Sequence, residues 1–553
     1  MEPSGPLLVD TGRGLSIRYM DRWLYSRRDP TAAPLEAARS AAILPDTLYL
    51  APSPCLCYGL AELVSRLPAS SAALCVETDP RLRAIASRAV SEGLRAEAAS
   101  GRVALCETRE ALSAYRALEA AVAARRFRRV VEVRLSGGRT VDERGYDGAI
   151  ASVEADIGSR YRNRLSLVRM GRLWTKNLIA NLGAMDWASV GPLRSGGKPV
   201  VACGAGPSLD SAIPYLRAAR DSVFLLACDT AAGALAAAGL APDAVVCLEG
   251  QVYNVADFLP LGAAASDEAS PRAAVPGAVV DLSAHPSSFR ALSGPKALTL
   301  SEWTDSAFLS RLSAAGLPVS AVPPLGSVGV LALRVAASLG GPIVVAGLDF
   351  SFYQGRTHCA GSPADLLSRR SETRTCKSAA AWDASFRDGR SRNGDGSLSD
   401  PALSMYASLA ASELRLAAEQ GVAAYDARGG LGAPLPATAP GEESLAGILR
   451  TARGACPEAT FGSSADPELA AARARSFLEG ELERAEAVAE ALRRGSDDAR
   501  LRSMLAEADF LYMHFPDPER VALLEDDALR RVAAEAAYWR GRLEDALSGP
   551  GDR

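Results

Sequence analysis

The feature that most constrains the fold is the stretch from Lys198 to Asp243, KPVVACGAGPSLDSAIPYLRAARDSVFLLACDTAAGALAAAGLAPD. Two short apolar runs, Val200–Cys203 and Val223–Cys228, alternate with segments of helical pattern. Continuous apolar runs of this length are typical of strands buried on both faces of a parallel sheet. A glycine turn follows the first run, and Ser208 is placed to cap the helix after it. The stretch predicts a βαβ unit whose glycine turn lies at the carboxyl end of the first strand, where open parallel sheets bind ligands.

The glycine turn suggests a phosphate site. Glycines let the backbone approach a ligand closely, and the free N–H groups at a helix start favour phosphate. The same turn is also compatible with a tight strand–helix connection that binds nothing, and its spacing is not the dinucleotide pattern. The candidate nucleotide- and phosphate-binding residues are Gly204, Ala205, Gly206, Pro207, Ser208, Asp229, Thr230, Asp243, Glu249, Gln251 and Ser327.

Three motifs carry a resemblance to a known family. GAGPSLD, followed by ACDTA and then GLAPDAVVCLEGQ, resembles the MptE-like domain of the motility accessory factors (Maf proteins), which are glycosyltransferase-like proteins linked to flagellin glycosylation. WTKNLIANL upstream, GSVGVLALRVAASLGGPIVVAGLDFSF downstream and the THCAG that follows it extend the match. The resemblance is good from about Trp174 to Gly430. The same domain resembles archaeal 6-hydroxymethylpterin diphosphokinases and, more distantly, bacterial sialyltransferases that use CMP-sugars.

The pattern of elements predicts an α/β protein in several parts. We expect a smaller α/β domain at 1–150, a helical connector at 151–190, a Rossmann-like catalytic domain with a parallel sheet at 191–455, and an α-helical bundle at 456–553. The central domain is expected to resemble CMP-sialic acid transferases. Ala263–Pro276 is rich in Ala, Ser and Pro and reads as a surface loop, and 352–400 reads as a long polar loop.

Composition excludes several classes of protein. The chain has 553 residues, 48% of them hydrophobic, and a net charge of −4, which argues against an overall electrostatic attraction to nucleic acid or anionic membrane. The N-terminus has no signal-peptide pattern, and the longest apolar run is interrupted by Arg334 and by Gly340–Pro342. The ten cysteines are dispersed, and the only close pair, Cys55 and Cys57, lacks nearby histidines. We therefore expect a cytoplasmic protein with no membrane span.

The N-terminal domain has the order of a nucleotide-binding fold without its glycines. Apolar runs at Thr47–Ala51 and Ala72–Glu77 are expected strands, and Glu77 stands where an acid could meet a ribose. The turn between them reads PSPCLCYG, so a phosphate has less access to the backbone. We therefore expect a structural or partner-binding domain rather than a second nucleotide site.

The resemblance implies transfer of a nonulosonic acid, of the pseudaminic or legionaminic type, from a CMP-sugar to Ser or Thr of flagellin. His358, in the THCAG element, is the candidate general base, although a lone histidine is by default a surface residue. Asp349 is a competing base or the residue that orients His358. Residues that could neutralise phosphate are Tyr353, Arg356, Arg374 and Lys377.

Two other functions stay open. One is an ATP- and Mg²⁺-dependent diphosphokinase acting on a pterin, with acids such as Asp229, Asp243, Glu249 and Asp349 as metal ligands. In the related proteins the position of Glu249 is often Asp, which puts such a role for it in doubt. The other is a non-catalytic adaptor that binds flagellin through the N-terminal domain or the helical tail. No metal is assigned from the sequence; Mg²⁺ stays possible, and the CMP-sugar would be a substrate.

Overall fold

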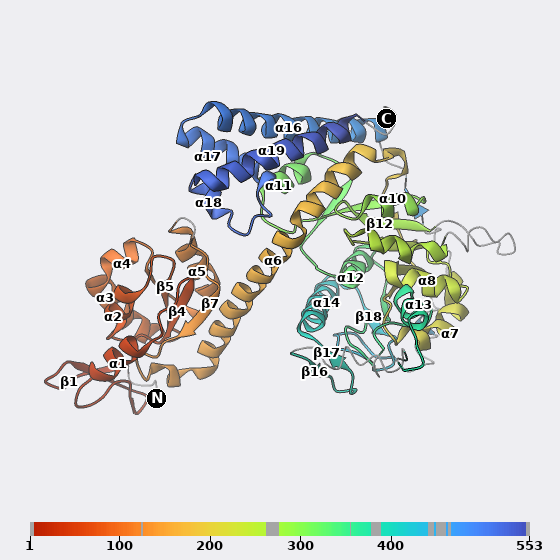
Figure 1. Ribbon diagram of the computed structural model, residues 1–553. Coiled ribbons are helices and arrows are strands. Elements are labelled where there is room, and N and C mark those ends of the chain that lie inside the picture. The colour runs from red at the N-terminus through yellow and green to blue at the C-terminus, as the bar shows by residue number, and fades with distance from the viewer. Residues whose placement is uncertain are drawn as a thin grey trace. The chain divides into compact units, whose positions relative to one another are not determined.

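The computed structural model describes residues 5–122, 125–261, 276–353, 356–375, 377, 389–440, 447–448, 460–462 and 466–548. The chain forms two compact units (Figure 1). The first consists of Met1–Arg169 and Phe515–Leu529, and the second of Met170–His514 and Arg530–Arg553. Helix α6 (Glu143–Ala184) begins in the first unit and ends in the second.

An eight-stranded parallel sheet forms the centre of the second unit, in the order β14-β13-β12-β11-β10-β9-β15-β18. Every residue is buried in five of its six inner strands, namely β9, β10, β11, β12 and β15. This confirms the α/β class and explains why those strands read as unbroken apolar runs. The strands are β9 (Val200–Cys203), β10 (Phe224–Cys228), β11 (Ala244–Cys247), β12 (Gly277–Asp281), β13 (Lys296–Ser301), β14 (Val319–Val322), β15 (Ile343–Ala346) and β18 (Ala424–Asp426).

The order of the strands creates a topological switch point between β9 and β15. The chain adds strands outward from β9 to β14 and then returns to the other side of β9. Right-handed crossovers place the helices before the return on one face and those after it on the other. Before it come α7 (Leu209–Ala219), α8 (Asp229–Ala237), α10 (Pro286–Ala291) and α11 (Ala307–Ala314); after it come α12 (Val328–Ser338) and α14 (Pro401–Glu419). Helix α12 packs on β9, β10 and β11, and α14 packs on α12 (Figure 1).

The remaining elements of the second unit are short pairs and long helices. Strand β8 (Leu193–Arg194) pairs with β19 (Thr460–Phe461), and β16 (Ser391–Arg392) pairs with β17 (Leu398–Ser399). The expected polar loop at 352–400 contains this second pair and helix α13 (Pro363–Arg370). Residues 378–388 of it, and nearly all of the expected loop at 263–276, lie outside the described residues.

The C-terminal segment is helical, as its pattern predicted. Helix α16 (Pro467–Arg494) begins at Asp466, whose carboxylate accepts the Leu469 N–H at 2.9 Å. Its buried Glu481 accepts two hydrogen bonds of 2.7 Å from Arg311 of α11. Phe510 is fully buried and packs against Phe308. The other helices are α17 (Asp498–Glu507), α18 (Glu519–Ala522) and α19 (Asp526–Leu547).

The first unit has its own parallel sheet, in the order β6-β5-β4-β7. Its strands are β4 (Thr47–Pro52), β5 (Ala72–Val76), β6 (Val103–Cys106) and β7 (Arg129–Glu132). Besides α18 and the starts of α6 and α19, its helices are α1 (Ala32–Ser40), α2 (Leu60–Arg66), α3 (Pro80–Gly93), α4 (Arg95–Ala99) and α5 (Ala111–Ala120). A three-stranded antiparallel sheet, β1 (Leu7–Asp10), β2 (Leu15–Tyr19) and β3 (Arg22–Trp23), was not predicted, because its strands are short and their apolar residues do not form a clear run.

Candidate functional site

The loops that follow β9 and β15 meet at the switch point, and we call them together the switch-point site. The Gly204 N–H donates to the Ala346 carbonyl at 2.8 Å, and the Gly206 N–H donates to the Gly347 carbonyl at 2.7 Å. A Cβ at Gly206 would lie 2.5 Å from Asp349 Oδ2, and one at Gly204 would collide with the Gly347 carbonyl. The glycines therefore allow two loops to pack against each other, in addition to any approach of a ligand.

Asp349 anchors this contact. Its Oδ2 accepts the Ser208 N–H at 2.9 Å, and its Oδ1 accepts the Ser208 hydroxyl. Asp349 is 3% exposed, and burial raises its pKa, opposed mainly by the two hydrogen bonds from Ser208. The prediction that the Ser208 hydroxyl caps α7 is wrong, because that hydroxyl donates to Asp349 and makes no capping bond. The carboxylate of Asp349 itself lies at the positive N-terminal end of α7.

These contacts leave few backbone N–H groups of the glycine turn free to bind a phosphate. The N–H groups of Gly204, Gly206 and Ser208 donate within the protein, and Pro207 has no N–H. Within the described part of the chain, no acceptor is seen for the Ala205 N–H. The role of this turn in binding phosphate stays a prediction, now centred on Ala205.

The THCAG segment docks on the glycine turn. The Cys359 N–H donates to the Ala205 carbonyl at 2.7 Å, and the Ala360 N–H donates to Asp210 Oδ1 at 2.9 Å. Arg356 forms an ion pair with Asp210 at 2.7 Å. Two segments about 150 residues apart in the sequence are thus held together at the switch point, and Arg356 already has a carboxylate partner.

His358 lies in this docked segment with its ring half-buried. Its Nδ1 is 2.9 Å from the Thr357 hydroxyl. Burial lowers its pKa, with the Asp365 carboxylate opposing that shift, so the imidazole is neutral at neutral pH. In the neutral tautomer whose Nδ1–H donates to the Thr357 hydroxyl, Nε2 is able to accept a proton.

A second buried carboxyl group follows β10, the strand on the other side of β9 from β15. Asp229, the first residue of α8, is 2% exposed and accepts the Thr230 N–H at 2.8 Å. Burial raises its pKa to about 7, and Asp257 adds to that shift while Asn254 opposes it. Burial also raises the pKa of Asp257 to about 6. Asn254 and Asp257, from the 3₁₀ helix η5 (Val252–Asp257), were missed because their segment shows no periodic pattern; their polar character directly after a strand was the available signal.

Asp243 is not part of this group. It precedes β11 and therefore lies at the amino end of the sheet, where it pairs with Arg220 at 2.9 Å and accepts the Leu225 N–H at 2.7 Å. The expectation that it flanks the ligand-binding end is wrong, because a residue before a parallel strand lies at the edge opposite to one that follows it.

The other predicted residues lie at several places in the second unit. Glu249 and Gln251 come after β11 and are exposed, and Glu249 Oε1 accepts the Gln251 N–H at 2.9 Å. Ser327 begins α12, and its hydroxyl accepts the Gly329 N–H at 3.3 Å. Arg374 and Lys377 are exposed, and the Tyr353 and Arg356 backbones are bonded to each other. Within the described ranges no three or more His, Cys, Asp or Glu side chains are arranged to hold a metal ion.

Helix α6 explains the WTKNLIANL motif. Asn177 donates from Nδ2 to the carbonyls of Gly250 and Ser283, at 2.8 and 3.0 Å. Asn181 donates in the same way to Leu282 and Ala284, at 2.9 and 2.8 Å. The motif therefore holds the loops after β11 and β12, which makes it a structural support for the loop that carries Glu249.

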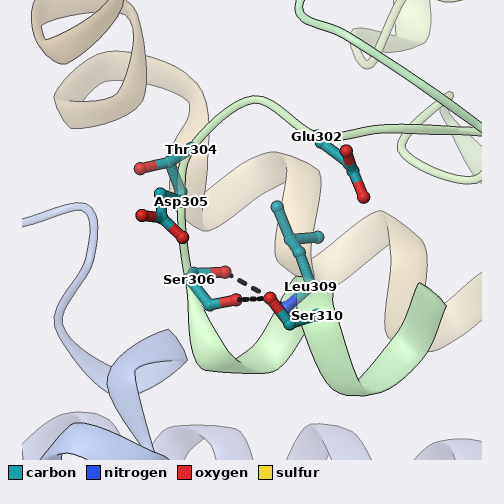
Figure 2. Close-up of a pocket in the computed structure, with 6 residues that line it drawn as sticks. All are labelled: Glu302, Thr304, Asp305, Ser306, Leu309 and Ser310. Atoms are coloured by element: carbon teal, nitrogen blue, oxygen red, sulfur yellow. Dashed lines mark hydrogen bonds between the residues drawn. The ribbon is translucent and has the colours of Figure 1, made fainter. Parts of the chain in front are cut away.

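A surface hollow of about 270 Å³ lies elsewhere on the same sheet, at the end of β13 and the start of α11. Figure 2 shows Glu302 lying opposite Thr304, Asp305 and Ser306, with Leu309 and Ser310 below. The hollow is separated from the switch point by β12, β11 and β10, so the topology rather than this hollow indicates where a ligand would bind.

Comparison with known proteins agrees with this architecture. Residues 176–355 match the family model described as 6-hydroxymethylpterin diphosphokinase MptE-like. The chain therefore contains an MptE-like domain. The solved structure of a Maf glycosyltransferase from Magnetospirillum magneticum AMB-1 is similar over 99% of this chain and 90% of that one, with a TM-score of 0.57 and 14% identity. The MptE-like resemblance seen in the sequence is thus confirmed for residues 176–355, and the likeness to the Maf glycosyltransferase is one of fold that extends beyond those residues.

Two curated relatives come from Treponema pallidum (strain Nichols), and both are described as uncharacterized proteins. One is 30% identical over 364 residues, which are 65% of this chain and 61% of the relative. The other is 33% identical over 90 residues, which are 16% of this chain and 43% of the relative. The chain thus matches less than two thirds of the length of each. No helix in the described ranges has the length and apolar character needed to cross a bilayer.

Proposed function

We propose that this protein is a glycosyltransferase that moves a nonulosonic acid from a CMP-sugar to Ser or Thr of flagellin in the cytoplasm. The observation that carries the proposal is the docking of the His358 segment on the glycine turn at the switch point. The MptE-like domain and the fold shared with a Maf glycosyltransferase support it.

In the proposed reaction a hydroxyl oxygen of the acceptor attacks the anomeric carbon of the donor. The new C–O bond forms as the bond from that carbon to the phosphate oxygen breaks, and CMP leaves with the bonding electron pair. Nε2 of the neutral His358 takes the hydroxyl proton. Asp349 acts as a positioning residue, since both of its carboxylate oxygens bond Ser208 and thereby hold the turn on which the His358 segment docks.

The test is direct. Wild-type protein is incubated with CMP-pseudaminic acid and unmodified recombinant flagellin, CMP release is followed, and the intact mass of flagellin is measured. We expect a mass increase of one sugar per modified hydroxyl, lost in His358→Ala. An unchanged flagellin mass with no CMP release would contradict the proposal.

The description of the matched family model favours one alternative, a diphosphokinase. Stabilisation of the protein by ATP with Mg²⁺, and not by CMP, in a thermal-shift titration would support it. Substitution of Gly206 is a poor control in this titration, because a side chain there meets Asp349 and disturbs the turn itself. His358→Ala should still be stabilised by CMP, because the imidazole acts on the acceptor hydroxyl, so this variant separates CMP binding from transfer.

A further inference from the structure

The 3₁₀ helix η5 presents three different rows of side chains, because residues three apart in such a helix lie one above the other. One row, Asn254 and Asp257, adjoins Asp229. The next row begins at Val252, which is 50% exposed, and ends inward at Phe258, which is 3% exposed. The last row, Tyr253 and Ala256 continued by Leu259, is exposed.

This last row is an apolar surface, and we call Tyr253, Ala256 and Leu259 the η5 ridge. Tyr253 is 81% exposed and Leu259 is 68% exposed. The ridge is on the same short helix as the residues that adjoin Asp229, so a molecule lying on it is next to the loops at the carboxyl ends of β10 and β11. No charged side chain belongs to the ridge itself.

The charged residues near the ridge and the apolar residues in it indicate what kind of molecule would bind there. Asp257 is a neighbour in the next row, and the exposed Glu249 precedes the helix. These carboxylates disfavour an acidic partner by like-charge repulsion. An aromatic and an aliphatic side chain favour an apolar one, and a transferase must hold its acceptor beside the donor.

We propose that the η5 ridge binds the acceptor polypeptide, in a segment that carries apolar side chains and no acidic ones next to the hydroxyl that is modified. The assignment deepens the proposed glycosyl transfer and rests on it.

The experiment compares wild type with the double variant Tyr253→Ser/Leu259→Ser, using CMP-pseudaminic acid and unmodified recombinant flagellin. The matched control is Leu416→Ser/Leu469→Ser, which removes two partly exposed leucines, 45% and 43% exposed, from α14 and α16. Three quantities are measured for each protein: hydrolysis of the donor by water, KM for flagellin in transfer, and direct binding of flagellin to immobilised protein.

We expect the ridge variant to raise KM for flagellin at least about tenfold, with donor hydrolysis unchanged and with both quantities unchanged in the control. An unchanged KM overturns the proposal. So does a parallel fall in hydrolysis, which would place the donor on the ridge, or a smaller oligomer by light scattering, which would place a second copy there.

Failure of the proposed function is distinguishable from these results. Wild type that neither hydrolyses the donor nor modifies flagellin would contradict glycosyl transfer. The binding measurement would then test the role of the ridge by itself. Flagellin binding that is lost only in the ridge variant would support the ridge as a polypeptide-binding surface, and no binding by wild type would overturn it.

Discussion

The two parallel sheets of this protein differ in the residues that surround their topological switch points. In the first unit the switch point lies between β4 and β7, and there Ser53 donates to the buried Glu77 at 2.7 Å while Tyr146 donates to the same carboxylate. In the second unit Ser208 donates to the buried Asp349. Both turns therefore join a serine hydroxyl to a buried acid.

The two turns differ in the other residues that contact them. In the first unit Ser136 donates to the Ser53 carbonyl at 2.6 Å, and a Cβ at Gly138 would collide with the Ser53 hydroxyl. Glu77 is fully buried, so its carboxylate has no surface for a ribose. In the second unit the turn carries a docked segment with a half-buried histidine. A shared topology thus does not imply a shared function, and chemistry is expected in the second unit alone.

The largest expected effect is on catalytic activity, which we expect from the second unit alone. His358→Ala should lower sugar transfer by about two to four orders of magnitude, the usual contribution of a general base. Affinity for CMP should be retained, because the imidazole acts on the acceptor hydroxyl. Steady-state CMP release and isothermal titration with CMP measure the two quantities, and full activity in this variant would remove His358 from the mechanism.

The next prediction concerns pH and the buried Asp229. Its pKa of about 7 in the folded protein lies above its ordinary value of 3.8, so the folded state binds this proton more tightly than the unfolded chain does. Its contribution to stability is complete in acid and is lost as the pH rises from about 4 to about 7. In Asp229→Asn the second unit should lose less stability over that range, by on the order of a few kcal/mol. Hydrogen exchange of β10 at pH 5 and pH 8 tests this, and an equal pH dependence in both proteins would contradict it.

Two matched substitutions test whether the buried carboxylates of Glu77 and Asp349 stabilise their units to the same extent. Glu77→Ala and Asp349→Ala each leave buried hydrogen-bond donors without an acceptor, so each should destabilise its own unit by about 2–4 kcal/mol. Only Asp349→Ala should also weaken CMP binding. Because the two units need not unfold together, hydrogen exchange is read separately for β4 and β9. Loss of CMP affinity in Glu77→Ala would mean that the first unit contributes to the site.

The smallest expected effect concerns the helix that supports the second sheet. Asn177→Ala removes the donor that joins the Gly250 and Ser283 carbonyls. We expect a loss of about 1–3 kcal/mol from the two unpaired buried carbonyls. Faster hydrogen exchange in the loops after β11 and β12, without a change in β15, would be the result; uniform faster exchange would indicate a global effect instead.

Much of the fold was predictable because its signals are local. The buried strands of both parallel sheets read as short apolar runs, and β9 was expected at the bounds it has. The helix start at Asp466 was also visible, since an acid followed by proline is a local signal. The small antiparallel sheet at the N-terminus was missed because its strands are short and lack such a run.

The candidate site was predictable only in part. That the glycine turn and Asp349 both follow buried strands could be read from the chain, but which strands are neighbours could not. Asp243 was wrongly assigned to the ligand-binding end of the sheet. It is close to Glu249 in the sequence, but the two residues stand at opposite ends of β11.

The sequence by itself determined where most strands of the two parallel sheets lie, that these sheets are parallel, and that glycine is needed in the turn after β9. The tertiary structure decided what those glycines do. The Ser208–Asp349 bond and the docking of Cys359 on Ala205 join residues far apart in the chain. Such contacts depend on strand order and on the close packing of loops at one edge of the sheet, and local propensity carries no information about either.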